Sequence, residues 1–161
     1  MKEIYLAGGC FWGVEEYFAR IEGVKNTKVG YANSSVESPT YQQVCTGATN
    51  AAETLHLEYD ESAIKLEKIL DYYFRIIDPI SVNKQGNDIG TQYRTGIYYV
   101  DNNDADIIKK YCEGIQKEYK QKLAVEIMPL ENFFDAEEYH QRYLKKNPNG
   151  YCHIDLSAME D

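Results

Sequence analysis

The sequence lacks most of the motifs that assign a chain of this size to a common function class. It has no CxxC pair, and its four cysteines are far apart, at positions 10, 45, 112 and 152. This spacing argues against a zinc knuckle and against a dense disulfide framework. The three histidines are scattered as well, so we expect neither a metal site nor a cofactor. GxSxG, P-loop, GxGxxG and HExxH motifs are absent.

The chain also lacks an excess of basic residues and any long apolar run. Seventeen Lys and Arg stand against 26 Asp and Glu, which gives a formal net charge of −9. Because nucleic-acid binders need clustered cations, we expect no nucleic-acid partner. The apolar stretch at 4–14 is too short to span a membrane and makes a poor signal peptide. We therefore expect no membrane association and a cytoplasmic protein with reduced thiols.

The apolar residues that are present suffice for one core. At 161 residues and 43% hydrophobic content, the chain predicts a single domain over 1–161. The predicted strands are 2–7, 25–32, 53–59, 95–100 and 125–130. The first predicted helix begins at or just after Cys10 and ends at Gly23, and the others are 62–77, 103–122 and 136–145. This order is close to β-α-β-β-α-β. It favours an α+β fold, a two-layer sandwich with a ferredoxin-like core and a loop-rich C-terminal tail.

Cys10 is the first candidate for chemistry. It follows Gly8 and Gly9 where the predicted first strand turns into a helix. Free backbone N–H groups and the positive end of the helix dipole favour the thiolate there, which is the reactive form. The alternative is a small buried hydrophobic residue, and position alone does not separate the two. Cys112 lies on the apolar stripe of its helix and Cys45 in a short apolar patch, so we expect both to be structural.

Glu53 is the second candidate. Residues alternate along its predicted strand, so Glu53 shares the apolar face with Leu55, Leu57 and Tyr59. A carboxyl group on that face must be paired or have its pKa raised by desolvation. With a pKa near neutrality it can donate a proton. The alternative is that Glu53 is the last exposed residue before the strand.

Six segments, in order along the chain, resemble the peptide methionine sulfoxide reductase A family. They are GGCFWGVEEYF at 8–18, GVKNTKVGYA at 23–32, PTYQQVCTG at 39–47, AETLHLEYD at 52–60, QGNDIGTQYRT at 85–95 and NPNGYCHID at 147–155. GCFWG combined with QGNDxGTQYR is highly specific. The resemblance implies a two-layer α/β sandwich with a ferredoxin-like core. It also implies reduction of the S epimer of methionine sulfoxide, free or in proteins.

The resemblance gives the matching residues their chemical roles. Cys10 resembles the nucleophile, and Glu53 resembles the acid that protonates the sulfoxide oxygen. Tyr41 and Tyr93 resemble the tyrosines whose hydroxyls point at that oxygen. These residue types suit the reaction, because sulfoxide sulfur is a poor electrophile until its oxygen is protonated or strongly hydrogen-bonded. The attack leaves a sulfenic acid on Cys10, which a second thiol must return to the thiol state.

The remaining matches concern the substrate pocket and recycling. Phe11 and Trp12 resemble the walls of the pocket for the substrate methyl group, and Asp88 resembles the carboxylate that helps to fix substrate. Cys152 matches a resolving cysteine, which would form a disulfide with Cys10 and make thioredoxin the reductant. The alternative is a one-cysteine cycle with glutathione or glutaredoxin. The tail HIDLSAMED after Cys152 lacks the glycines and further cysteine of many relatives, so it has less freedom.

Two rival function classes stay open at this point. One is a binding module that recognises oxidised or hydrophobic peptides without turning them over, with a purely structural cysteine. The other is a different thiol enzyme, such as a peroxidase. A thiol, an acid and phenols together argue against the binding module. Turnover of free methionine sulfoxide against that of peroxide separates the two enzymes.

Overall fold

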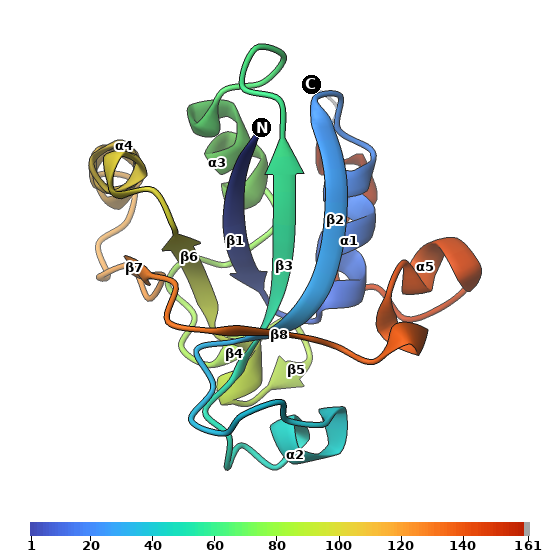
Figure 1. Cartoon of the computed structure of the whole chain (residues 1–161). Coiled ribbons are helices and arrows are strands. Elements are labelled where there is room, and N and C mark those ends of the chain that lie inside the picture. The colour runs from blue at the N-terminus through green and yellow to red at the C-terminus, as the bar shows by residue number, and fades with distance from the viewer. Residues whose placement is uncertain (160–161) are drawn as a thin grey trace.

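A mixed six-stranded sheet forms the centre of the computed structural model, which describes residues 1–159. Residues 160 and 161, the end of the predicted single domain, lie outside that part. The strand order is β7-β6-β1-β3-β2-β8 (Figure 1). Among the strands of residues 1–159, only β6 and β7 pair in parallel. The strands are β1 Lys2–Gly8, β2 Val24–Ala32, β3 Ala52–Tyr59, β6 Thr95–Tyr99, β7 Glu126–Pro129 and β8 Phe133–Asp135.

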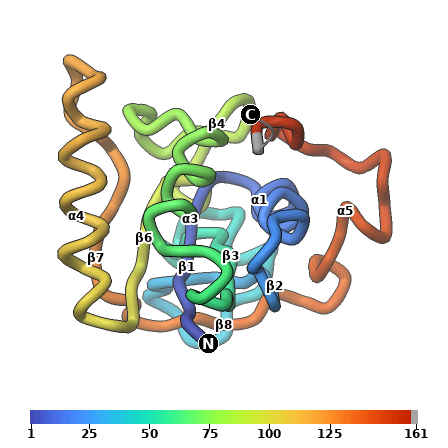
Figure 2. The backbone as a smooth tube through the Cα atoms, turned by 90° about the horizontal axis from the view of Figure 1, so that it is seen from above, coloured from blue at the N-terminus to red at the C-terminus, as the bar shows by residue number. Residues whose placement is uncertain are grey.

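The longer helices lie on one side of this sheet. They are α1 Phe11–Ala19, α3 Leu66–Phe74 and α4 Asn102–Gln116. Both views place α1 and α3 next to each other over the central strands, with α4 beyond them near β6 and β7 (Figures 1 and 2). Shorter pieces lie in the connections: α2 Tyr41–Cys45, β4 Lys84–Gln85, β5 Asp88–Ile89, α5 Tyr143–Lys146 and three 3₁₀ turns at Thr91–Tyr93, Glu138–His140 and Leu156–Met159.

The core lies between the sheet and this helical layer. Alternate residues of each strand point toward the helices, and the register sets Leu6 of β1 opposite Leu55 of β3. The buried side chains that meet here include Ile4, Leu6, Val14, Tyr17, Phe18, Leu55, Leu57, Ile69, Leu70 and Tyr73. The other face of the sheet carries a smaller cluster around Tyr5, Tyr98 and Phe133. The chain between β7 and α5 crosses that face (Figure 1).

The predicted strands are confirmed within about two residues, and the helices less well. The predicted helix 62–77 is shorter, because α3 spans Leu66–Phe74. The prediction of one helix over 136–145 is wrong. Arg142 takes a left-handed conformation with φ of 54°, and its N–H donates to Glu15 Oε1 at 2.6 Å. A buried carboxyl group on α1 thus competes with helix continuation. Within residues 1–159, no helix is long and apolar enough to cross a membrane.

Candidate active site

The start of α1 brings the first candidate residues together. β1 ends at Gly8, and Gly9 turns the chain with φ of +90°. A side chain at Gly9 would also lie 2.9 Å from the Gln85 side chain, so only glycine fits there. Cys10 follows as the N-cap residue of α1. Its side chain is nearly buried, with 8% of the residue exposed.

Cys10 and Glu53 share the free N–H groups at this helix start. The Phe11 N–H donates to Glu53 Oε1 at 3.2 Å, and the Trp12 N–H donates to the Cys10 sulfur. Burial raises the pKa of Cys10 well above that of an ordinary thiol, and the Glu53 carboxylate raises it further, while the Trp12 N–H lowers it. The N–H group at the helix start thus acts in the predicted direction, toward the thiolate, while burial acts against it and is the larger effect in the free protein.

Glu53 is a buried carboxyl group with one free oxygen. It is 1% exposed and lies on the helix side of β3, which confirms the predicted face and excludes the exposed alternative. Oε1 accepts the Phe11 N–H, but Oε2 has no partner among residues 1–159. Burial raises the pKa of Glu53 to about 8, with the Phe11 N–H lowering it and the Asp88 charge raising it. At neutral pH the group is thus mostly a neutral acid that can donate a proton.

Tyr41 and Tyr93 border the same carboxyl group from two loops. Tyr41 begins α2, and its backbone N–H donates to Glu137 Oε2 at 2.9 Å. Tyr93 ends the 3₁₀ turn Thr91–Tyr93. Burial raises the pKa of both phenols, and the negative charge of Glu53 raises it further. Both side chains therefore remain neutral hydroxyl donors around Glu53.

Trp12 is fixed by two residues that the sequence did not indicate. Its indole N–H donates to Nδ1 of the buried His140 at 2.9 Å. Its ring stacks on Tyr143, with ring centroids 3.8 Å apart and planes 10° from parallel. Burial lowers the pKa of His140, so the ring is neutral and can accept this hydrogen bond. The His140 ring also contacts Tyr41, at a centroid distance of 4.5 Å.

Phe11 and Asp88 are the two remaining candidate residues of the substrate pocket. Phe11 is buried and packs on Tyr31, with ring centroids 5.8 Å apart. Asp88, on β5, accepts a hydrogen bond from the Tyr151 hydroxyl at 3.1 Å. The charge of Asp88 acts on the pKa of Cys10 and of Glu53. The loop at 80–94 thus supplies a carboxylate to the candidate site.

Comparison with known proteins decides the family. A family model described as "Peptide methionine sulfoxide reductase" matches residues 2–161. The chain belongs to the peptide methionine sulfoxide reductase family. It is 59% identical to the peptide methionine sulfoxide reductase MsrA of Clostridium acetobutylicum over 99% of both chains. The activity of this family is that of an oxidoreductase acting on methionine sulfoxide.

Solved structures agree with this assignment. Mxr1 of Saccharomyces cerevisiae in its reduced form matches with a TM-score of 0.90 and 42% identity, over 96% of this chain and 91% of the yeast chain. Mxr1 in complex with Trx2 matches with a TM-score of 0.64 and 30% identity, over 88% of this chain and 84% of that one. The mixed α/β architecture is therefore that of the reductase family.

The four cysteines of this reductase have different surroundings. All four are free thiols. Cys152 is half-buried, and its charge acts on the pKa of Cys10. Cys112 is buried, as predicted from its helix stripe. Cys45, expected to be structural, is exposed at the end of α2, and its side chain is hydrogen-bonded with that of Tyr41.

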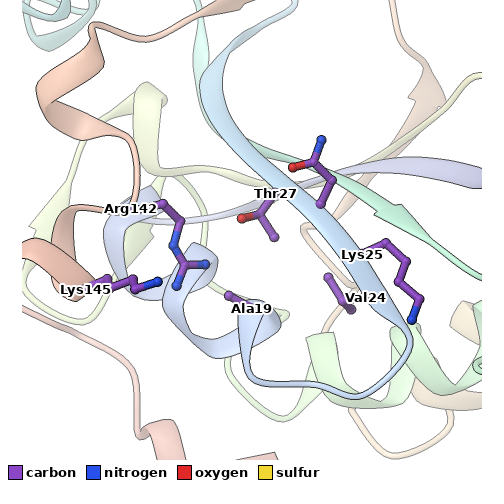
Figure 3. A pocket seen from close by; sticks show the side chains of 7 residues that line it. Ala19, Val24, Lys25, Thr27, Arg142 and Lys145 are labelled. Atoms are coloured by element: carbon purple, nitrogen blue, oxygen red, sulfur yellow. The ribbon is translucent and has the colours of Figure 1, made fainter.

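A separate cavity of about 340 Å³ lies away from these residues. It is lined by Ala19, Val24, Lys25, Asn26, Thr27, Arg142 and Lys145. Figure 3 shows the ends of Arg142 and Lys145 pointing toward one another, while Lys25 points away on the far side. No candidate site residue lines this cavity, so it adds nothing to the chemistry at Cys10. The described part of the chain holds no group of three or more His, Cys, Asp or Glu that could bind a metal ion.

Proposed function

We propose that Cys10 attacks the sulfur of methionine S-sulfoxide, free or in proteins, while Glu53 protonates the sulfoxide oxygen. The observation that carries this proposal is the pairing of the two groups at one helix start. The Phe11 N–H holds one Glu53 oxygen, and the other oxygen is buried without a partner among residues 1–159. A buried neutral carboxyl group with a free oxygen beside a thiol suits proton donation to a bound substrate.

Two tyrosines assist at the same oxygen in this proposal. Tyr41 and Tyr93 keep their hydroxyl protons because burial raises their pKa. Each hydroxyl then donates a hydrogen bond to the sulfoxide oxygen and stabilises the charge that develops there. Trp12 and Phe11 form the apolar wall for the substrate methyl group. Asp88 fixes the rest of the substrate, with its position set by the Tyr151 hydroxyl.

The first step balances as follows. The Cys10 sulfur attacks the substrate sulfur and forms a transient S–S bond. The protonated oxygen then passes to the Cys10 sulfur, so that a new S–O bond forms while the S–S bond and the S–O bond of the substrate break. Glu53 gives its proton to the oxygen and takes up the thiol proton. Methionine sulfur is reduced by two electrons, and Cys10 is oxidised by two electrons to a sulfenic acid. No metal or organic cofactor is needed.

Recycling uses Cys152 in this proposal. Its thiol displaces water from the Cys10 sulfenic acid and forms a disulfide, which a dithiol protein of the thioredoxin class reduces. The solved complex of the related Mxr1 with Trx2 supports this choice of reductant. A one-cysteine cycle with glutathione or glutaredoxin is the alternative. Because these reductants act in the cytoplasm, we propose that compartment for the protein.

The proposal extends to the architecture, which we describe as a single domain over 1–161 with a ferredoxin-like core. Strands β6-β1-β3-β2 are adjacent in this order, and each pair is antiparallel. With α1 and α3 as the two connections over one face, this arrangement supports the β-α-β-β-α-β description. In this arrangement the end of β1 and the start of β3 lie next to the start of α1, where Cys10 and Glu53 meet.

Steady-state turnover tests the proposed activity against its rivals. The protein is supplied with a dithiol reductant and, in separate reactions, with the S epimer of methionine sulfoxide, the R epimer or hydrogen peroxide. We expect methionine from the S epimer and little product from the other two. Binding without turnover would favour the non-catalytic module, and faster reduction of peroxide would favour a peroxidase.

A further inference from the structure

The Cys152 sulfur lies against Gly13 of α1, and the His153 ring lies against Gly8 and Gly9 just before the helix. We propose that Gly13 and His153 are positioning residues that hold Cys152 beside Cys10 before any substrate is reduced. The inference rests on the proposed recycling through Cys152 and adds to it. In this arrangement Cys152 is held near Cys10 before oxidation, and a mobile tail is not needed to bring it there.

Gly13 provides the space in which the Cys152 sulfur lies. A Cβ atom added at Gly13 would lie 3.0 Å from Cys152 Sγ and 3.2 Å from Ile154 Cδ1. Real Cβ atoms rarely have contacts this short, so with a larger residue the sulfur would have to move by a few tenths of an ångström. Glycine inside a helix costs about 1 kcal/mol relative to alanine. Gly13 therefore makes α1 less stable than alanine would, but it leaves space for the Cys152 sulfur.

The position of the Cys152 sulfur at Gly13 sets its distance from Cys10. Residues three apart at a helix start have Cβ atoms about 5–6 Å apart. Adding the contact at Gly13 places the Cys152 sulfur within about 9 Å of the Cys10 Cβ. A disulfide requires two Cβ atoms about 3.5–4.5 Å apart. In a disulfide each sulfur lies about 3 Å from the partner's Cβ atom, so the Cys152 sulfur must still move toward Cys10 by up to about 6 Å.

His153 fixes the same segment on the other side of Cys10. Its Nε2 lies 2.9 Å from the carbonyl oxygen of Gly8. Because a carbonyl can only accept, Nε2 carries the proton and donates it. The same nitrogen would be 2.8 Å from a Cβ at Gly9, so the ring fits only over a glycine. Cys152 is thus held between contacts to Gly8 and Gly9 before Cys10 and the contact to Gly13 after it.

The chain beyond His153 keeps this arrangement ordered. The Cys152 thiol donates to the carbonyl oxygen of Ile154 at 3.3 Å. Ile154 is buried in the main core, and Leu156 packs against that core. The carbonyl of Ala158 accepts from the Arg75 guanidinium at 3.2 Å. Ile154 and Leu156 therefore anchor the segment that follows Cys152 to the core.

The step that this placement serves is disulfide formation. Cys152 sulfur bonds to Cys10 sulfur, the S–O bond of the sulfenic acid breaks, and the oxygen leaves as water with the thiol proton. No further oxidant is consumed, because the sulfoxide has already oxidised Cys10. Misplacing a reacting group by about 1 Å can cost roughly 10²-fold in rate. A displaced Cys152 sulfur should therefore slow this step while methionine formation continues.

The variant Gly13→Ala tests whether Gly13 positions the Cys152 sulfur, and it has a matched control. The control is Gly114→Ala on α4, where an added Cβ meets no atom within 4 Å. Both changes favour their helices by a similar amount, so loss of folding is not the expected outcome. One equivalent of methionine S-sulfoxide is added to reductant-free protein, and methionine, dimedone-reactive sulfenic acid and free thiols are followed in time. We expect Gly13→Ala to form methionine at nearly the native rate but to close the disulfide about tenfold more slowly or worse.

His153 is tested by a pair of variants in the same assay. His153→Leu removes the donor to Gly8, and His153→Gln keeps an N–H donor of similar reach. We expect slow disulfide closure in His153→Leu and partial rescue in His153→Gln, with methionine formation unchanged in both. A general loss of stability would not be rescued by the glutamine.

The possible outcomes distinguish the positioning role of Gly13 and His153 from the proposed activity and from recycling through Cys152. No methionine from the native protein would contradict the proposed activity itself. Methionine with loss of one thiol in both the native protein and Cys152→Ser would contradict recycling through Cys152, and the inference with it. Two thiols lost at native speed in Gly13→Ala and His153→Leu would overturn the positioning role alone.

Discussion

The start of α1 and the middle of α4 each bury a thiol, yet only the first surrounds it with polar groups. Cys10 is 8% exposed and Cys112 is 5% exposed. Burial raises the pKa of both thiols, for Cys112 to about 11 with no other cause. Around Cys10, by contrast, Glu53, Asp88 and the Trp12 N–H also act on the pKa. Burial alone makes a thiol inert, and the convergent acid and donors make the difference.

The largest expected effect comes from removing each sulfur in turn. Cys10→Ser should abolish methionine formation, because an alcohol offers almost no oxyanion near neutral pH and cannot form the sulfenic intermediate. Cys112→Ser should keep turnover of methionine S-sulfoxide. Methionine release under dithiol reductant measures both. Native turnover by Cys10→Ser would break the comparison at once.

The next largest effect concerns the acid that only Cys10 has nearby. Glu53→Gln keeps the shape of the side chain and loses the acidic proton. We expect the first chemical step to slow by roughly a hundredfold or more, with substrate binding retained. Single-turnover methionine formation is the measurement. An unchanged rate would mean that a tyrosine supplies the proton and that Glu53 is structural.

The pH dependence of the single-turnover rate also tests Glu53 as the acid, with a smaller expected effect. Because burial raises the pKa of Glu53 to about 8, the carboxyl group is protonated below that pH and loses its proton above it. The single-turnover rate should therefore fall by about tenfold per pH unit above pH 8. Glu53→Gln should lack this fall. A profile from pH 6 to 10 on both proteins checks it, and the same alkaline fall in both would assign it to another group.

The smallest effect is expected at the inert thiol. Cys112→Ala removes one buried sulfur atom from the core. Burial is the only cause that shifts the pKa of this thiol. We expect activity within about twofold of native and a loss of about 1–2 kcal/mol in the free energy of unfolding. Urea unfolding and turnover measure the two. A large loss of activity with unchanged stability would mean that α4 takes part in the chemistry.

Local sequence patterns carried part of this account. Strand alternation placed Glu53 on the core side, and the two glycines before Cys10 marked the turn into α1. The Trp12 partners His140 and Tyr143 could not be predicted this way, because they come from the far end of the chain, in a segment where the helix pattern fails at Arg142. Burial also opposes the thiolate preference predicted for the helix start. The burial that outweighs it arises from tertiary packing, which local periodicity does not report.

The central claim is that Cys10 alone among the four thiols receives the sulfoxide oxygen. The most direct measurement uses Cys152→Ser, which cannot close the proposed disulfide. One equivalent of methionine S-sulfoxide is added in the presence of dimedone, and the labelled peptides are identified by mass spectrometry. We predict one adduct, on Cys10, in the same amount as the methionine formed. Methionine without an adduct on Cys10, or an adduct on Cys45 or Cys112 in its place, would contradict the account.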